Sequence, residues 1–231
     1  MACAPKVVSF HFGLPAPHVI EALRARGVKL IGCATNVAEA KALEAGGFDA
    51  LVAQGAEAGG HRGVFIGAPH ENDMGAMALT PQIVDAVSIP VIAAGGIFDG
   101  RGVAAAFMLG ASGAQIGTAF LRAPESAISP LHKHALAAAP DNTTRVTRLF
   151  TGRPARSIRN RLTDALAAHE AEAAPFPTQR GMLAPLAKAA TAQSKSDISP
   201  LWSGQAGPRA LEASSADIFQ RICAEAQALL G

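Results

Sequence analysis

Five apolar runs of strand length, each followed by a helical pattern, constrain the fold of this 231-residue chain more than any other feature. The runs begin at Val7, Val28, Asp49, Pro90 and Gly113. Alternating strands and helices with short links predict a parallel sheet, because each connecting helix must pack back over the strands that it joins. Apolar residues make up 49% of the chain and charged residues 16%, as expected of strands that are buried on both faces.

Capping residues mark the ends of two of the expected helices. Asn36 and Glu39 have capping-box spacing for a helix that ends at the glycine pair 46–47. After a long Gly-rich loop, Thr80 as N-cap and Pro81 at the first helical position predict the start of a further helix.

No further strand is expected beyond Pro140. Segments 144–162 and 216–230 have helical periodicity in part, and residues 175–186 have the composition of an ordered loop. We therefore expect residues 140–231 to form a helical and loop cover on the strand–helix units of residues 1–139, within the same domain.

Two architectures fit five strand–helix units. A TIM (β/α)8-type barrel has eight units, and at about 25–30 residues each the other three would need about 80 more residues. Because the first strand begins only six residues after Met1, a barrel implies a chain that is truncated at its N-terminus. The alternative is an open five-stranded doubly wound sheet.

Composition excludes several classes of protein. The net charge is +2 and the Lys and Arg residues are scattered, which argues against a nucleic-acid partner. The three cysteines are widely spaced and fit neither a disulfide framework nor a CxxC metal site, which favours a reducing compartment. No stretch resembles a membrane span or a signal peptide, so we expect a cytoplasmic protein without a membrane partner.

The first candidate site is the segment QGAEAGGHRG, residues 54–63, directly after the third strand. Ligands of parallel α/β folds bind at the carboxyl ends of the strands. The glycines of this loop let the backbone approach a flat ligand closely. His61 could serve there as a general base, because an unperturbed imidazole has a pKa of about 6.5. The alternative is a surface or core histidine, and Glu57 and Arg62 either orient His61 or are structural charges.

The second candidate site is a phosphate cradle built from two later strand ends. Gly95 and Gly96 follow the fourth strand, and Gly117 and Thr118 follow the fifth, each pair just before a helix start. Exposed N–H groups and the helix dipole favour an anion at such places, and we expect φ to be positive at Gly96 and Gly117. Plain turns are the alternative for each pair.

The remaining histidines indicate no metal site. His132 and His134 lie two apart on an expected helix and cannot share a face, and residues 70–74 (HENDM) lack metal-ligand spacing. His11 either points into the barrel mouth or packs beside its phenylalanine neighbours.

Six segments together resemble a known family. They are SFHFGLP, AQGAEAGGHRG, PVIAAGGIFDGRG, LGASGAQIGTAFL, FTGRPAR and LWSGQA, in this order and across nearly the whole chain. They resemble the signature segments of the nitronate monooxygenase (2-nitropropane dioxygenase) family, and AQGAEAGGHRG is the most specific of them. The resemblance implies a TIM barrel that binds FMN without a covalent link and oxidises alkyl nitronates with O₂ to carbonyl compounds and nitrite.

The resemblance also assigns roles to individual residues. It implies that His61 is the catalytic histidine beside the flavin and that Gln54 and Gly59 contact the flavin. It implies that the ribityl phosphate is held by Gly96, with its neighbour Gly95, and by the run Gln115, Ile116, Gly117 and Thr118. The expected partners are a small nitronate or nitroalkane and O₂. A homo-oligomer is one option for the assembly, and the sequence does not decide it.

Two departures from the family pattern bear on activity. Family members have three further N-terminal strand–helix units, whose loops contact the flavin ring and the substrate. The chain also contains no tyrosine, and Phe176 stands in the segment where the family has its tyrosine near the substrate.

Two rival functions stay open, the first because the same phosphate site would serve it and the second because the chain is short. One is another FMN-barrel reaction, the reduction of quinones or enoyl thioesters by NAD(P)H. The other is a fragment or binding remnant without activity.

Overall fold

The computed structural model describes residues 5–68 and 72–231. Contacts divide the chain into two compact units. Unit 1 consists of Met1–Ala56, Gly63–Ile97 and Gly102–Gln115, and unit 2 consists of Glu57–Arg62, Phe98–Arg101 and Ile116–Gly231. Each unit is described by itself.

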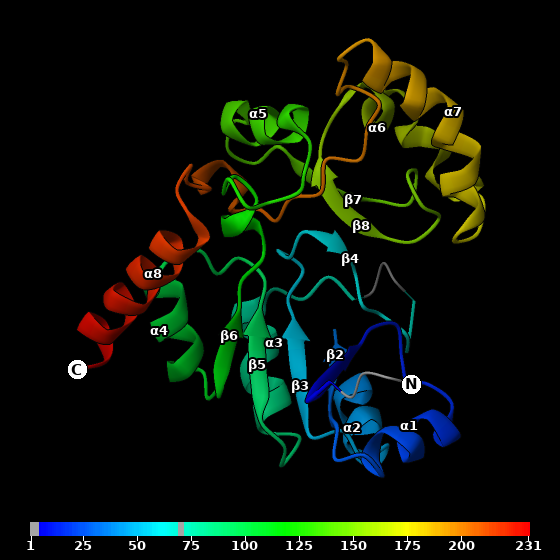
Figure 1. Ribbon diagram of the computed structural model, residues 1–231. Coiled ribbons are helices and arrows are strands. Elements are labelled where there is room, and N and C mark those ends of the chain that lie inside the picture. The colour runs from blue at the N-terminus through cyan, green and yellow to red at the C-terminus, as the bar shows by residue number, and fades with distance from the viewer. Residues whose placement is uncertain (1–4, 69–71) are drawn as a thin grey trace. The chain divides into compact units, whose positions relative to one another are not determined.

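Unit 1 is built on a five-stranded parallel sheet. Its strands, in spatial order, are β1 (Val7–Phe10), β2 (Lys29–Ala34), β3 (Ala50–Gln54), β5 (Val91–Ala94) and β6 (Gly113–Gln115). Each strand therefore lies beside the next one of the sheet along the chain (Figure 1). The five predicted strands are confirmed. A doubly wound sheet reverses its strand order at a switch point, so this sequential order rules out the doubly wound alternative.

The helices of unit 1 alternate with these strands. They are α1 (Pro17–Arg24), α2 (Val37–Ala45), α3 (Ala76–Val84) and α4 (Gly100–Met108), of which α4 has its first two residues in unit 2. A core of fully buried side chains, including Leu30, Leu51 and Ile83, joins sheet and helices. Gly32 on β2 lets α2 approach closely, because a Cβ there would lie 2.5 Å from Leu43 Cδ2.

The predicted start of the third helix is wrong. α3 begins at Ala76, after Gly75, and Pro81 lies inside it. Leu79 and Ile83, four residues apart, are both fully buried and form one face of the helix. Burying this face favours a helix that continues through Pro81, although the proline forfeits one backbone hydrogen bond. Thr80 is a buried helical residue and not an N-cap.

Asn36 caps α2 as predicted, but the capping box is only half formed. The Asn36 side chain accepts a hydrogen bond from the Glu39 N–H at 2.9 Å. The Glu39 carboxylate, fully buried, instead accepts from the N–H and hydroxyl of Thr35 and from the N–H groups of Phe65 and Ile66. All four contacts are donors to its oxygens, so this carboxylate ties the loop at 65–66 to the end of β2.

We expect Glu39→Gln to lower the free energy of unfolding by about 2–4 kcal/mol, measured by urea denaturation. The amide keeps the shape of the side chain but turns an NH₂ group toward N–H donors that then lack an acceptor. Glu21→Gln is the matched control, because Glu21 is exposed on α1 and its loss should change stability by less than about 0.5 kcal/mol. Equal stability of the two variants would contradict the role of Glu39.

Unit 2 contains a three-stranded antiparallel sheet that the sequence analysis did not predict. Its strands, in spatial order, are β4 (Gly60–His61), β8 (Ala155–Ile158) and β7 (Thr144–Thr147). The prediction that no strand follows Pro140 is therefore wrong. Val146, Leu149 and Phe150 have i, i+3, i+4 spacing, which mimics a helix in a short window.

Helices and turns complete unit 2. They are η2 (Thr118–Phe120), α5 (Pro130–Ala138), α6 (Arg161–Ala165), η3 (Ala167–Glu172), α7 (Thr178–Ala192), η4 (Gly207–Arg209) and α8 (Ser215–Leu230). The helices predicted within 216–230 and before residue 140 are confirmed. The loop predicted at 175–186 is wrong from Thr178 onward, where α7 begins directly after Pro177 and includes Pro185. Its Gln, Arg, Met, Leu and Ala residues have high helix propensity.

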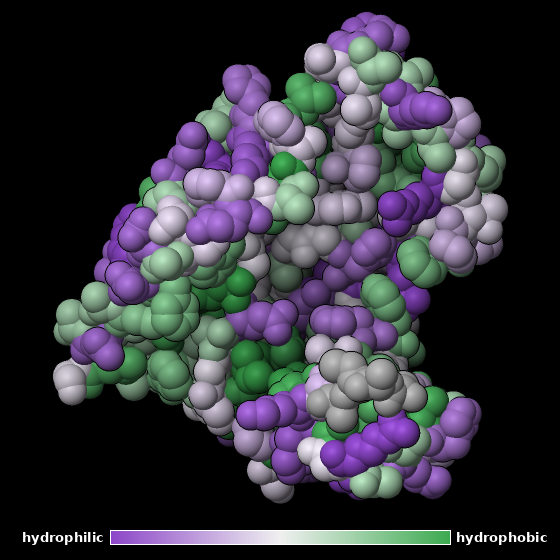
Figure 2. All heavy atoms as spheres, in the orientation of Figure 1, coloured by the Kyte–Doolittle hydropathy of each residue, from purple (hydrophilic) through white to green (hydrophobic). Residues whose placement is uncertain are grey.

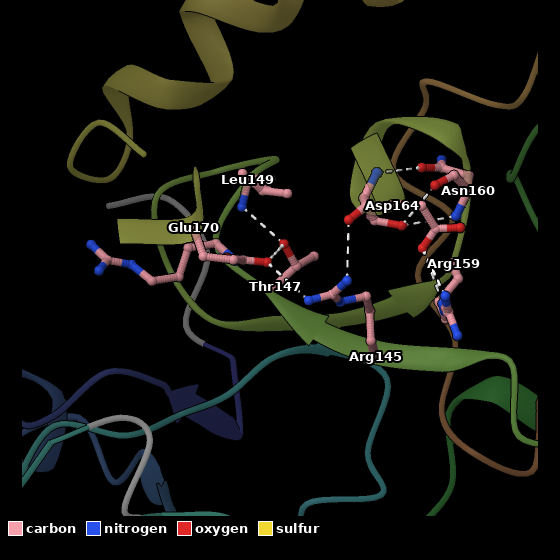
Figure 3. A network of polar contacts seen from close by, with 9 residues as sticks. Arg145, Thr147, Leu149, Arg159, Asn160, Asp164 and Glu170 are labelled. Carbon is pink, nitrogen blue, oxygen red and sulfur yellow. Dashed lines mark hydrogen bonds and ion pairs between the residues drawn. The ribbon is translucent and has the colours of Figure 1, made fainter. Parts of the chain in front are cut away.

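A polar network secures the β7–β8 hairpin (Figure 3). The Thr147 hydroxyl donates to Glu170 Oε1 at 2.5 Å and accepts from the Leu149 N–H at 3.1 Å. Arg145 Nη1 donates to the Thr163 carbonyl at 3.1 Å, and Asn160 and Thr163 form a reciprocal capping box on α6. These contacts fasten β7 to η3 and α6.

The surface drawn in Figure 2 has hydrophilic and hydrophobic residues interspersed. Exposed apolar side chains include Met77, Met108 and Phe219. In the part of the chain that the structure describes, no helix has the length and apolar character needed to cross a bilayer.

Candidate active site

Gln54 joins the two ends of the predicted flavin loop, residues 54–63. Its side chain is 8% exposed, and Oε1 accepts a hydrogen bond from the Gly63 N–H at 2.7 Å. Gly63 fits closely, since a Cβ there would lie 2.7 Å from Cys33 Sγ. Gln54 therefore has a structural role at the end of β3, and its contact with a flavin stays a prediction.

The other predicted cofactor residues of unit 1 lie at neighbouring strand ends. Gln54 is paired with Ala94 and Ala94 with Gln115 in the sheet register, so three carboxyl ends lie side by side. Gly95 and Gly96 follow with φ of 108° and 71°. The predicted positive φ of Gly96 is confirmed, and such a conformation favours glycine.

Gly117 differs from this prediction. It lies in unit 2 at the N-cap of η2, with φ of −113°, so the predicted positive φ is wrong there. A Cβ at Gly117 would meet no described atom within 4 Å, and the residue therefore faces open space. Ile116, beside it, is partly buried. The next residue, Thr118, accepts a hydrogen bond from the Gly204 N–H at 3.0 Å through its hydroxyl, which keeps its own O–H as a donor.

His61 is held by the hairpin of unit 2. It lies on β4 opposite Ala155, and its Nε2 is 2.9 Å from Thr151 Oγ1. Thr151 Oγ1 is also within 3.2 Å of the Arg153 carbonyl oxygen, so this hydroxyl connects the imidazole to the backbone of the hairpin.

Aromatic rings surround the half-buried imidazole. Phe176 meets it edge-on at a centroid distance of 5.8 Å, and Trp202 lies at 5.5 Å with an interplanar angle of 42°. Phe150 supports Trp202 from the side at 5.6 Å. These rings restrict the orientation of His61 and reduce its contact with water.

The electrostatic surroundings keep His61 neutral. Burial lowers the pKa of His61 below 6.5, and the positive charges of Arg153 and Arg180 lower it further. A neutral imidazole near pH 7 can accept a proton, and the same two arginines favour an anion nearby.

The backbone segment Trp202–Gln205 connects the predicted residues of unit 2. The Gln205 N–H donates to the Glu57 carbonyl at 3.0 Å, and Gly204 reaches Thr118 as described. Gly59 packs directly on this segment, because a Cβ there would lie 2.4 Å from the Gly204 nitrogen. Gly59, His61 and Thr118 are thus brought together around one segment.

A buried histidine anchors this segment from α5. His132 Nε2 is 3.0 Å from the Trp202 carbonyl, which can only accept, so Nε2 donates. Burial lowers the pKa of His132, partly offset by this hydrogen bond, and the ring stays neutral. His132, set aside in the sequence analysis, is a support for Trp202.

The sequence analysis missed the partners of His61. Thr151 and Trp202 were not singled out, although they lie in two of the six resembling segments, FTGRPAR and LWSGQA. Arg62, considered as an orienting residue, is buried, and its N–H donates to the Pro154 carbonyl. His70 and Glu71 lie outside the described residues.

The predicted site residues divide between the units. Gln54, Gly95, Gly96 and Gln115 belong to unit 1, and Gly59, His61, Ile116, Gly117 and Thr118 belong to unit 2. Their union in one cofactor site stays a prediction.

The sequence profile of one family, described as nitronate monooxygenase, matches residues 1–225. The chain belongs to the nitronate monooxygenase family. A probable nitronate monooxygenase of Staphylococcus saprophyticus is 46% identical over 211 residues, which cover 90% of this chain and 59% of that protein. One of Staphylococcus aureus (strain Newman) is also 46% identical, over 86% of this chain and 56% of its own length. The chain thus spans less than two thirds of these family members.

Solved structures show the same relationship. The nitroalkane oxidase of Streptomyces ansochromogenes is 40% identical with a TM-score of 0.90, over 98% of this chain and 66% of that one. FabK of Thermotoga maritima is 32% identical with a TM-score of 0.78, over 97% and 69%. These neighbours confirm the predicted class, an α/β fold of the TIM-barrel type.

We expect NMR titration to give His61 a pKa below 6.5. Arg153→Gln should raise this pKa, because removing a neighbouring positive charge favours the protonated ring, and Arg180→Gln should act in the same direction. Arg159→Gln is the control, since Arg159 is exposed and paired with Asp164. A His61 pKa that does not move in Arg153→Gln would show that the charge of Arg153 is not felt at the ring.

Proposed function

We propose that this protein oxidises alkyl nitronates with O₂ to carbonyl compounds and nitrite, with FMN as cofactor and His61 as the catalytic residue. The observation that carries the proposal is His61 itself, a half-buried neutral imidazole oriented by Thr151 and two aromatic rings and placed near two arginines. Family membership supports the reaction class.

The surroundings of His61 suit an anionic substrate. The neutral imidazole of His61 can take the α-proton of a nitroalkane, which converts it to the nitronate, and the positive field of Arg153 and Arg180 stabilises the negative charge that forms. Phe176 and Trp202 provide apolar surface for the alkyl group. Phe176 stands where family members have a tyrosine, so we propose a preference for more apolar nitronates.

The residues assigned to FMN fit a phosphate and a flat ring. Gly96 has the positive φ that a close backbone approach requires, and the open space at Gly117 is what a phosphate needs beside η2. Within the proposal, the phosphate is held by Gly95, Gly96, Gln115, Ile116, Gly117 and Thr118, and the ring is contacted by Gln54 and Gly59. Bound FMN would take up the electrons of the substrate and pass them to O₂.

The second candidate is the rival reaction named above, a reduction of quinones or enoyl thioesters by a nicotinamide nucleotide at the same site. Anaerobic mixing with NADPH separates the two. Rapid bleaching of the flavin would support the reductase, and bleaching by a nitronate but not by NADPH would support the proposed oxidation.

We expect His61→Asn to reduce kcat/KM for nitroalkanes by about 10²-fold or more while FMN stays bound, because a positioned acid or base contributes on this scale. Steady-state nitrite release measures the activity, and flavin absorbance measures the cofactor. His134→Asn is the control, since His134 is exposed on α5. Full activity of His61→Asn would remove His61 from catalysis, and loss of flavin would make its role structural.

We expect Gly96→Val and Gly117→Val to weaken FMN binding strongly, measured by fluorescence titration of apo-protein. The two should differ in stability. Valine at Gly96 costs about 1–3 kcal/mol because of the positive φ, whereas Gly117→Val should melt like the parent.

Gly46→Ala is the control for these variants. Gly46 is the C-cap of α2 and is not among the residues assigned to FMN, so the change should leave FMN affinity unchanged. Unaltered FMN binding in Gly117→Val would place the phosphate elsewhere.

A further inference from the structure

A cavity of about 330 Å³ lies within unit 2 between α8 and the turns η2 and η4. None of the residues assigned above to FMN or to the surroundings of His61 lines it. Its volume is at the lower end of the range that small-molecule sites occupy.

The apolar side of the cavity is firmly built. Ile218 and Ile222, one turn apart on α8, are 3% and 7% exposed and face it. α8 is attached to the first residue of α4, because Glu225 Oε2 accepts a hydrogen bond from the Gly100 N–H at 3.0 Å. A Cβ at Gly100 would lie 2.3 Å from the Ala226 nitrogen, so the two backbones are in direct contact.

The polar side of the cavity is predominantly positive. Arg122, Arg209 and Arg221 line it, against one carboxylate, Asp99. Asp99 is 12% exposed and already paired with both Arg101 and Arg209. Two arginines therefore already compensate the negative charge of Asp99.

Two of these guanidinium groups are held in position with donors to spare. Arg122 Nη1 donates to the Ala210 carbonyl at 2.8 Å, while its Nη2 pairs with Glu212, whose side chain is 76% exposed. Arg209 lies over the Phe98 ring at 5.7 Å, and its Nη2 donates to Asp99 Oδ2 at 3.1 Å. An ion pair whose carboxylate is this exposed is weak, so a better acceptor can replace Glu212.

We propose that this cavity binds a small carboxylate with an apolar body. The carboxylate displaces Glu212 from Arg122 and takes a second hydrogen bond from Arg209, and the apolar body rests on Ile218 and Ile222. Hydrogen bonds between a guanidinium and a carboxylate are charge-assisted and therefore stronger than those between neutral groups. The site is separate from that of the proposed oxidation, because none of its lining residues is assigned to FMN or to the surroundings of His61.

The test uses 2-naphthoate as the probe and its neutral amide, 2-naphthamide, as the matched comparison, titrated by calorimetry into the FMN-saturated protein. We expect naphthoate to bind at least about tenfold more tightly than the amide, since the lost contacts are charge-assisted. Arg122→Gln and Arg209→Gln should each weaken naphthoate binding by about tenfold or more, and Arg159→Gln should leave it unchanged.

Glu212→Gln provides a test of opposite sign that does not depend on the folding of the arginine variants. Removing the competing carboxylate should tighten naphthoate binding several-fold. Equal affinity for acid and amide, or weaker binding in Glu212→Gln, would overturn the proposal. Displacement of naphthoate by rising FMN concentration would also overturn it, because the probe would then occupy the cofactor site.

Discussion

The contact between two backbones, at Gly59 and at Ser203–Gly204, is the constraint on which the candidate active site depends. No side chain fits between these segments, since a Cβ on Gly59 would overlap the Ser203 carbonyl carbon and the Gly204 nitrogen. Once they touch, β4 is fixed beside β8, and Trp202 is fixed beside the imidazole of His61. The glycines of this loop therefore serve the packing of the protein as well as any flat ligand.

The pattern of the chain was sufficient to predict the parallel sheet but insufficient for unit 2. Strands β1, β2, β3, β5 and β6 are short apolar runs, and the burial of β2, β3 and β5 on both faces leaves a plain signal. The hairpin β7–β8 is mostly polar, and its partners lie in η3 and α6, so its stability comes from contacts such as Thr147–Glu170 that no local window contains. The helix start predicted from Thr80 and Pro81 was wrong for a related reason. Burial of Leu79 favours a helix that begins earlier, and this outweighs the local helix-start signal.

The candidate site was predictable in part for similar physical reasons. His61 could be found because it follows a strand in a glycine-rich loop, a position that is read directly from the sequence. Thr151 is 90 residues away from it, and His132 is 70 residues from the carbonyl of Trp202 that it holds. Hydroxyl and imidazole groups of this kind are common in any chain, and only the fold selects the ones that meet.

The short turn η2 has a consequence for the energetics of the protein. Thr118, its first residue, is tied to Gly204 by a hydrogen bond, while Ala119 of the same turn and Arg122 just beyond it line the cavity against α8. Backbone hydrogen bonds from the Phe120 N–H to the Gly117 carbonyl and from the Leu121 N–H to the Thr118 carbonyl join the two ends of this turn. A ligand that orders the turn from one side would leave less conformational entropy to be lost when a second ligand binds on the other side. Under that condition binding on the two sides is thermodynamically linked, and each ligand changes the other's affinity by the same factor.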